Sequence, residues 1–286
     1  MSELNDIFRN PRCWHAIMCV VFAVGLLGLA QASPSARLQD LEKTVPSSEK
    51  FALAQKKFRL VGITAGKFLM GTEGGVADEQ PATRVRISEP FWMGATEVTQ
   101  GQYRAVMGQV TPEPRSDHAV VDVSWFDAVE FCRRLTEQAG RAGWLPKGFH
   151  FSLPTEAQWE YACRAGTTGD FAGDLTELGW FSGNARLQKH PGRVAQKRAN
   201  NWGLFDMHGN KWEWCLDWYA PYPGGNVTDP AGPPIGSFRI GRGGSSGHLP
   251  SRCRSAARNF DSPEYKSGDL SFRIVLCAVP VNPQRK

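Results

Sequence analysis

The stretch from Trp202 to Trp218 (WGLFDMHGNKWEWCLDW) constrains the fold more than any other part of the chain. It combines four tryptophans, three carboxylates and two glycines within seventeen residues. Neither an amphipathic helix nor an alternating strand needs this mixture. Two interpretations stay open: aromatic rings and a glycine turn wall a site whose carboxylates hold a hard cation, or the segment is a tryptophan-rich corner of the core with capped turns.

The N-terminus has the pattern of an export signal. Arg9 and Arg12 precede an uncharged apolar run at 16–30, and Ala30-Gln31-Ala32 is a small-x-small cleavage sequence. The run is shorter than the roughly 20 residues of a membrane span, which favours cleavage over a retained anchor. We therefore predict a periplasmic protein without a stable membrane span. Its parts are a signal peptide (1–32), an extension (33–57), one domain (58–280) and a tail (281–286).

The composition is that of a globular domain rich in turns. Hydrophobic residues make up 41% and charged residues 21%, while 30 glycines and 19 prolines predict many loops and few long helices. The net charge of +5 is spread along the sequence, so no basic run indicates nucleic-acid binding. The cysteines include no C-x-x-C pair, which argues against a zinc ribbon or a thioredoxin-type site.

Hydrophobic periodicity gives a coarse map of the elements. Alternation predicts strands at 58–63, 66–71, 83–87 and 91–94. Three helices begin with capping side chains: Thr99 with Gln102, Ser124, and Thr155 with Gln158. Gly108 and Gly166 are placed to end the first and third of them. Beyond Gly166 we predict loops with short strands, one at 238–240 and a final pair at 253–258 and 271–277.

The turn inside the tryptophan-rich stretch is a candidate calcium site. Calcium prefers several oxygen ligands at about 2.3–2.6 Å, and Asp206 and Glu213 with two backbone carbonyls meet that need. The alternative is that both carboxylates cap turns. His208 lies in the same turn, and a single histidine is more often structural than a ligand.

Arginines gather toward the C-terminus, at Arg242, Arg252, Arg254, Arg258 and Arg273. One interpretation is that they hold an acidic substrate by bidentate contacts. The other is that they pair with carboxylates close in the sequence, such as Asp261, Glu264 and Asp269. The residues alone do not decide between the two.

The order of motifs along the chain resembles the formylglycine-generating enzyme family, also called sulfatase-modifying factors. The matching pieces include Phe68-Leu69-Met70-Gly71, Glu97-Val98-Thr99, Val123-Ser124-Trp125, Leu153-Pro154-Thr155-Glu156, Gly203 through Asp217, Arg242-Gly243-Gly244-Ser245 and Cys253-Arg254-Ser255-Ala256. The resemblance covers about residues 58–277. It implies a single compact α+β domain, related to C-type-lectin-like folds, with little regular secondary structure and with bound calcium.

The resemblance also implies particular ligands and pairings. The calcium ligands carried over from the family are the Asp206 side chain, the Gly209 and Lys211 carbonyls and the Glu213 carboxylate. The cysteine positions imply two disulfides and leave Cys215 unpaired. These disulfides would join Cys163 to Cys253 and Cys132 to Cys277.

One departure from the family concerns its copper. The copper-dependent enzymes hold the metal with two cysteines between the R-G-G-S motif and the following arginine-rich motif. Here that interval, Ser246 to Arg252, contains none. A soft Cu(I) site needs thiolates, and the single imidazole of His248 cannot replace two of them. We therefore expect no copper and no conversion of sulfatase cysteines by that mechanism.

Exported members of the family without these cysteines suggest the function. We predict a periplasmic maturation factor that binds a peptide-like molecule, such as the precursor of the siderophore pyoverdine, and promotes its oxidation. Its site would use aromatic walls, arginines for acidic groups and one acid or base. In that order, these residues are Trp202, Trp212 and Trp214, then Arg242 and Arg254, then His248 or Glu264. The alternative is a non-catalytic module that binds a protein partner in a secretion system or an accessory pathway of a metalloenzyme.

Overall fold

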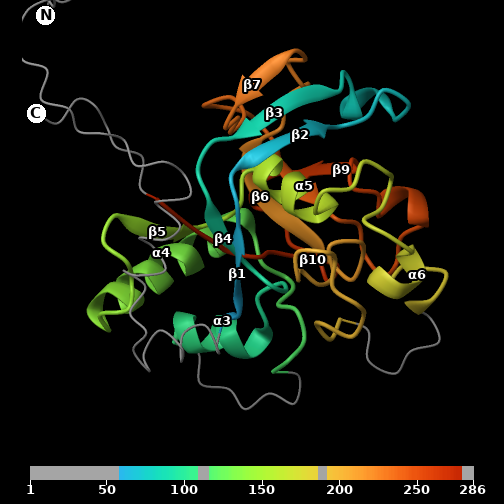
Figure 1. Ribbon diagram of the computed structural model, residues 1–286. Coiled ribbons are helices and arrows are strands. Elements are labelled where there is room, and N and C mark those ends of the chain that lie inside the picture. The colour runs from blue at the N-terminus through green and yellow to red at the C-terminus, as the bar shows by residue number, and fades with distance from the viewer. Residues whose placement is uncertain (1–57, 109–115, 186–191, 279–286) are drawn as a thin grey trace, which may run out of the picture. The chain divides into compact units, whose positions relative to one another are not determined.

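Three small sheets organise the protein in the computed structural model, which describes residues 58–108, 116–185 and 192–278 (Figure 1). The predicted signal peptide, N-terminal extension and tail lie outside these residues. Within the described ranges, no helix is both long and apolar enough to span a membrane. The mixed sheets and few helices confirm the predicted α+β class.

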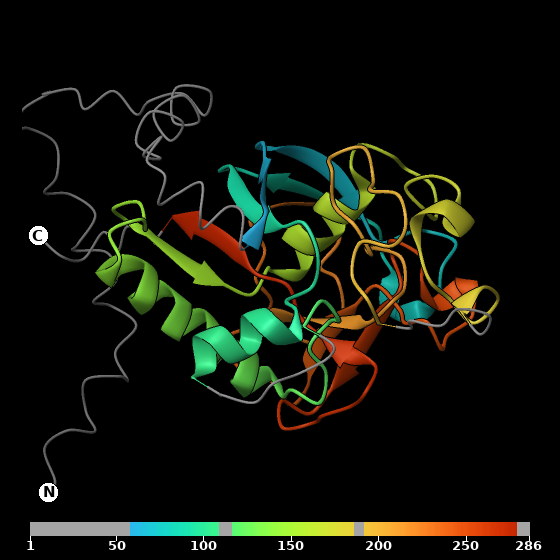
Figure 2. The same cartoon turned by 90° about the horizontal axis from the view of Figure 1, so that it is seen from below.

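The first sheet brings the beginning and the end of the domain together. Its strands are β1 (Leu60–Ile63), β4 (Phe91–Gly94), β11 (Val275–Ala278) and β5 (Phe149–Ser152), in that spatial order and all antiparallel. The last strand therefore lies between two strands made much earlier. Figure 2 shows β5 beside α4 (Trp125–Arg141), which packs against this sheet.

The second and third sheets carry the remaining strands. In the second, β6 (Trp212–Trp218) lies between β10 (Leu270–Ser271), to which it is parallel, and β8 (Arg239–Arg242), followed by β9 (Arg258–Asp261). In the third, β3 (Thr83–Ile87) lies between β2 (Gly66–Met70) and β7 (Asn226–Thr228). Both β2 and β7 are thus edge strands.

The helices begin where the capping residues predict. Besides α4 they are α3 (Gln100–Met107), α5 (Glu156–Arg164) and the short α6 (Leu175–Leu178), with 3-10 turns η1 (Ala77–Glu79) and η3 (Pro250–Arg252). Capping boxes at Thr99, Ser124 and Thr155 confirm the three predicted starts. The first helix ends at Gly108 with positive φ, as predicted, while the third ends one residue before Gly166, at Ala165.

Two large apolar clusters and a small third one, of Leu175, Phe181 and Cys253, form the core of the described residues. The first gathers side chains of α3 and α4 around Trp214, Phe131 and Phe272. The second packs α5, through Trp159 and Tyr161, against β2 and β3. The tryptophan-rich stretch therefore contributes to both, because Trp214 and Cys215 point to opposite faces of β6.

Two predictions about strands were incomplete or wrong. The segment Trp212–Trp218 is a strand, although its residues do not alternate, because both faces of β6 are buried. The predicted pairing of 253–258 with 271–277 is wrong: β9 pairs with β8, and β11 pairs with β4 and β5. Local periodicity carries no information about such distant partners.

The two disulfides implied by the family are not present. Cys132, Cys163, Cys215, Cys253 and Cys277 are all free thiols. In the first implied pair, each thiol contacts a backbone carbonyl instead of the other sulfur. The Cys163 Sγ contacts the Met207 carbonyl at 3.6 Å, and the Cys253 Sγ contacts the Ser245 carbonyl at 3.9 Å. Burial raises the pKa of both thiols to about 12. Little thiolate, the species that forms disulfides, is therefore present at neutral pH.

Candidate functional site

A tight turn at Asp206–Lys211 precedes β6. Asp206 and Asn210 adopt left-handed conformations, with φ of 59° and 61°, and Gly209 has φ of 112°. The Gly209 N–H donates to the Gly243 carbonyl at 2.8 Å, and a Cβ on Gly209 would lie 2.0 Å from the Trp180 carbonyl oxygen. Only glycine fits there, so the backbone of this turn is held in one shape.

Glu213, a predicted calcium ligand, is bound to Arg273 instead. Arg273 donates to both carboxylate oxygens, from Nε at 2.6 Å and from Nη2 at 2.6 Å. The Trp159 Nε1 adds a third hydrogen bond at 2.8 Å. Glu213 and Arg273 are fully buried. Both carboxylate oxygens of Glu213 are therefore already used within the fold, and Glu213 does not fit as a ligand of the calcium that the family implies.

Asp206 fits a cation better, together with a residue that the sequence did not single out. One oxygen of Asp206 accepts from the Ala195 N–H at 2.7 Å, and the other, Oδ1, is buried without a donor. Glu97 is equally buried: Asn210 Nδ2 donates to its Oε1 at 2.8 Å, and its Oε2 has no donor. Glu97 belongs to one of the motifs that carry the family resemblance, but its place beside this turn could not be predicted, because the two lie far apart along the chain.

The charges of this buried cluster do not balance. Glu97, Asp206 and Glu213 lie near the guanidinium of Arg273, and Glu97 also lies near the ammonium group of Lys211, so three carboxylates face two cations. Burial, reinforced by the neighbouring carboxylates, raises the pKa of Glu97 well above its usual range, and burial raises that of Asp206 to about 6. Within the described residues, no three His, Cys, Asp or Glu side chains form a metal site by themselves. Two carboxylate oxygens and the turn carbonyls are the donors available to a hard cation.

His248, the predicted acid or base, lies at an accessible polar cluster. Its Nδ1 is 2.6 Å from the Ser245 Oγ and 3.9 Å from Asp269 Oδ2. Ser245 is fully buried, whereas the side chains of His248 and Asp269 are 37% and 42% exposed. Trp212 meets the imidazole edge-on, with ring centroids 5.6 Å apart.

This cluster does not form a Ser-His-Asp triad. In a triad, one imidazole nitrogen contacts the serine and the other contacts the carboxylate. Here Nδ1 faces both Ser245 and Asp269, and Ser245 also accepts from the Gly247 N–H at 3.3 Å. The arrangement leaves His248 able to exchange a proton with a bound molecule, while Ser245 orients the ring.

Arg252 completes the surface around His248. Its guanidinium lies 5.2 Å from the ring centroid of Trp212 and donates to Asn259 at 3.2 Å. Arg252 was one of the C-terminal arginines considered from the sequence but was not selected for the site. His248, Arg252 and Asp269 together present a proton carrier and both signs of charge, and the buried ring of Trp212 packs against the imidazole; we call these four residues the His248 surface.

Most of the arginines pair with glutamates distant in the sequence. Arg242 binds Glu160, Arg254 binds Glu79 through two hydrogen bonds, Arg258 binds Glu156 in the same way, and Arg273 binds Glu213. The nearby acids suggested by the sequence are not these partners. Arg242 is fully buried, so it supports the scaffold and offers no free guanidinium to a substrate.

The remaining predicted residues are dispersed. Trp214 is buried, with its Nε1 donating to the Val123 carbonyl, and Trp202 packs against Tyr161 in the second core cluster. Glu264 is exposed and accepts from the Ser262 hydroxyl. Of the predicted aromatic walls, only Trp212 therefore lies at His248.

His208 has a structural place. Its Nε2 accepts from the Ala172 N–H at 3.0 Å and its Nδ1 lies 2.9 Å from the Cys253 carbonyl. Burial lowers the pKa of His208 to about 4, so the ring is neutral at physiological pH. Both nitrogens are used within the fold.

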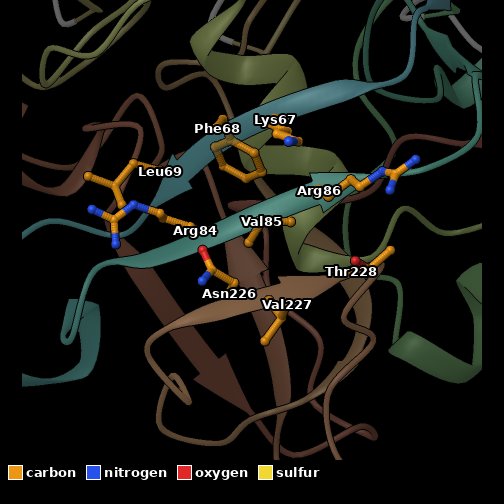
Figure 3. Close-up of a pocket in the computed structure, with 9 residues that line it drawn as sticks. All are labelled: Lys67, Phe68, Leu69, Arg84, Val85, Arg86, Asn226, Val227 and Thr228. Atoms are coloured by element: carbon orange, nitrogen blue, oxygen red, sulfur yellow. The ribbon is translucent and has the colours of Figure 1, made fainter.

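Two cavities border β2, away from the His248 surface. One, of about 570 Å³, lies over β2, β3 and β7 and contains three cationic side chains, Lys67, Arg84 and Arg86 (Figure 3). The other, of about 400 Å³, lies between β2 and the loop 166–170 that follows α5. They share lining residues of β2 and no residue with the His248 surface.

Comparison with known proteins gives a consistent result. A family model described as the sulfatase-modifying factor enzyme 1-like domain matches residues 47–278. The formylglycine-generating enzyme of Streptomyces coelicolor is 34% identical over 204 residues, covering 64% of this chain and 60% of that enzyme. The enzyme of Bos taurus is 27% identical over 335 residues, covering 88% of this chain and 84% of the other.

Solved structures agree in fold. Treponema denticola variable protein 1 superposes with a TM-score of 0.66 and 27% identity, over 76% of this chain and 94% of that one. PvdO from Pseudomonas aeruginosa gives a TM-score of 0.65 at 22% identity, over 76% and 93%. At that level of identity the second likeness concerns the fold alone.

Proposed function

This chain belongs to the sulfatase-modifying factor family, and we propose that it is an exported, periplasmic maturation factor that acts on a peptide-like molecule. The observation that carries the proposal is the His248 surface. There a half-exposed imidazole stands beside Trp212 and Arg252, with Asp269 at its edge. Export is supported by the apolar run at 16–30 and the Ala30-Gln31-Ala32 sequence.

Each residue of this surface has a role in the proposed reaction. Arg252 holds an acidic substituent of the bound molecule, and the accessible imidazole of His248 contacts its flat group, while the buried Trp212 ring holds the imidazole edge-on. His248 removes one proton as the bound molecule loses two hydrogens, and Asp269 stabilises the resulting imidazolium. The second hydrogen leaves with both electrons to an acceptor outside the chain; dissolved dioxygen, the simplest acceptor, would be reduced to hydrogen peroxide. The precursor of a pyoverdine-type chromophore is flat, acidic and peptide-linked, and is our leading substrate.

Formylglycine formation, the activity in the names of the relatives, is not part of this proposal. The stretch Ser246–Arg252 has no cysteine, and the imidazole of His248 is the one side chain in it that could bind a soft metal. A Cu(I) ion requires soft thiolate ligands. We therefore expect a purified protein without stoichiometric copper.

We propose calcium as a structural cofactor of the turn before β6. Asp206, with its donor-free Oδ1, and the Gly209 and Lys211 carbonyls would hold it, and the excess of buried negative charge favours a divalent cation. Calcium there would neutralise the cluster and fix the turn. Glu97 Oε2 replaces Glu213 as the second carboxylate donor in this proposal, because Arg273 and Trp159 occupy Glu213.

The metal proposal is tested by thermal unfolding in calcium and in EDTA. We expect calcium to raise the melting temperature of the wild-type protein, and Asp206→Asn and Glu97→Gln each to remove most of that increase. Glu264→Gln, at an exposed acid, is the matched control and should keep it. A melting temperature that is insensitive to calcium but rises on acidification would show that Glu97 and Asp206 share a proton instead.

The function is tested by deleting the gene and analysing secreted metabolites by mass spectrometry. We expect a precursor two hydrogens heavier than the mature product to accumulate. Complementation with His248→Gln should fail, whereas His150→Gln, on β5 and outside the His248 surface, should restore the product. If no heavier precursor accumulates, the oxidation role is wrong and a non-catalytic role as a binding module is favoured.

A further inference from the structure

The edge strand β2 has an unpaired side. It pairs with β3 only, in the register Lys67 to Arg86, Phe68 to Val85 and Leu69 to Arg84. Within the described residues, the backbone of Gly66–Met70 has no further hydrogen-bond partner. In an antiparallel edge strand, every second residue directs its N–H and C=O groups away from the sheet. A row of free donors and acceptors is therefore available along β2.

There is room beside this edge. The cavity of about 400 Å³ runs from Lys67 and Leu69 to Tyr161 and the loop 166–170. Its volume falls in the range of ligand-binding clefts, about 300–1,000 Å³. The Tyr161 hydroxyl donates to the Thr64 carbonyl just before β2, which holds one end of the cavity in place. An extended backbone can enter this space without displacing a structural element.

The outer face of the same sheet is cationic. Lys67, Arg84 and Arg86 are exposed, and no carboxylate lines the cavity above them. The smaller cavity is lined by both signs of charge, Lys67 and Arg164 with Glu73 and Asp170, so the attraction for an acidic segment comes from the outer face. Figure 3 shows Leu69 next to Arg84 at one end of this cavity and Arg86 toward the other. Lys67 and Arg86 are directly opposite each other across the two strands, and like charges in this position are destabilising. An anionic partner would relieve that repulsion.

We propose that an extended acidic segment of a partner protein binds here by adding a strand to the free edge of β2. Main-chain hydrogen bonds to β2 supply affinity, and side chains on the outer face supply specificity. A fourth strand would place alternate side chains over Lys67 and Leu69, which lie on the same face two residues apart. The partner segment thus carries an acidic residue opposite Lys67 and an apolar residue two positions away, opposite Leu69.

This docking edge goes beyond the proposed function, because it does not use the His248 surface. The two fail independently: loss of binding at β2 leaves a free metabolite able to reach His248. A partner held at β2 would instead bring a protein-attached substrate or an oxidising enzyme close to the molecule.

The binding test uses a fluorescein-labelled peptide of repeating Glu-Thr-Val-Thr, which places a glutamate and a valine two positions apart on one face, with fluorescence anisotropy at low salt. We expect saturable binding that weakens as salt rises. Lys67→Glu and Arg84→Glu should each weaken it by about tenfold or more, and the same peptide with lysine in place of glutamate should bind the reversed variants in preference to the wild type. Lys147→Glu, an exposed lysine outside both cavities, is the matched control and should bind as the wild type does.

A second peptide separates strand addition from simple charge attraction. Methylation of alternate backbone nitrogens keeps every side chain but removes the edge hydrogen bonds, so the methylated peptide should not bind. Equal binding of both peptides would overturn the strand-addition proposal. Binding of vesicles rich in phosphatidylglycerol that is lost in the same charge-reversal variants, with no peptide binding, would assign the face to a membrane surface instead.

Discussion

The buried ion pair between Glu213 and Arg273 gives a quantitative test of the structure, because both side chains are fully buried. We consider Glu213→Gln, which preserves the size of the side chain and an acceptor for Trp159 but removes the charge. Arg273 would then remain fully buried, near Glu97 and Asp206 but with no carboxylate hydrogen-bonded to its guanidinium. It would still donate to the Gly94 and Phe205 carbonyls at 3.0 Å each. The lost interaction is thus a charge pair and not the whole hydrogen-bond network.

The size of the effect follows from burial. Removing one partner of a buried ion pair costs about 3–5 kcal/mol, because the other charge stays desolvated. For a domain of this size, each kcal/mol lowers the melting temperature by about 2–4 °C, which gives a decrease of about 6–20 °C. With a urea dependence of about 2 kcal/mol per molar, the unfolding midpoint should fall by about 1.5–2.5 M.

Urea unfolding of four proteins measures this: the wild type, Glu213→Gln, Arg273→Met and the double variant. The double variant should be more stable than the sum of the single losses, by about 2 kcal/mol, because it removes both charges of the pair. These measurements are made in EDTA and reductant, so that calcium loss or oxidation cannot imitate the result, and the wild type and Glu213→Gln are then measured again in calcium. Glu130→Gln, which removes an exposed partner of Arg133 and Arg134, should leave the midpoint nearly unchanged.

A small effect would refute the reasoning. If Glu213→Gln costs less than about 1 kcal/mol in EDTA, the pair is not what holds Arg273 in the core. If the loss appears only in calcium, Glu213 is a metal ligand, as the family resemblance implies, and its contact with Arg273 is secondary. Strict additivity of the two single variants would show that the two groups do not interact.

Three further changes test other parts of the fold. Gly209→Ala introduces a Cβ 2.0 Å from the Trp180 carbonyl at a positive φ, so we expect a loss of about 3 kcal/mol or more in urea unfolding and no calcium-dependent increase in melting temperature; a fully stable variant would contradict the turn geometry. Thr155→Ala removes the cap of α5 and should cost about 1 kcal/mol, measured in the same way, whereas Thr155→Ser should cost much less. Burial and the adjacent Glu156 raise the pKa of Asp217 to about 8, so between about pH 4 and pH 8 the folded state keeps a proton that the unfolded state releases. The stability that this group contributes is therefore complete below about pH 4 and is lost as the pH rises to about 8. Asp217→Asn should flatten this decline in the free energy of unfolding. An unchanged pH profile would show that Asp217 is ionised in the folded protein.

The sequence predicted the local structure of the N-terminal half well. In the capping boxes at Thr99 and Thr155, the threonine side chain accepts from the backbone N–H of a glutamine three residues later, and that glutamine side chain accepts from the threonine N–H. Each helix start is therefore encoded within four residues. The alternation of Thr83–Ile87 is just as local, and β3 has those bounds. The family resemblance likewise followed from short motifs in a fixed order.

The site was predicted less completely, because its contacts are not local. Glu97 meets the turn at Asp206 across more than a hundred residues, and Asp269 reaches His248 from a separate loop. Tryptophan and arginine also have two uses that the sequence does not distinguish. Arg242 carries the same guanidinium as Arg252 but lies in the interior. Trp212 and Trp214 are both buried, and of these two only Trp212 contacts His248.

The four glutamate–arginine pairs have a consequence for the order in which the protein is made. Glu79, Glu156, Glu160 and Glu213 are synthesised first, and each waits for an arginine that lies between Arg242 and Arg273. Of the early acids, only Glu160 has another cationic neighbour in its own helix, Arg164. A carboxylate without its partner resists burial, so the core cannot close around a nascent chain that ends before these arginines. Folding is thereby deferred until Arg273 has been synthesised, and the proposed export requires such an unfolded chain.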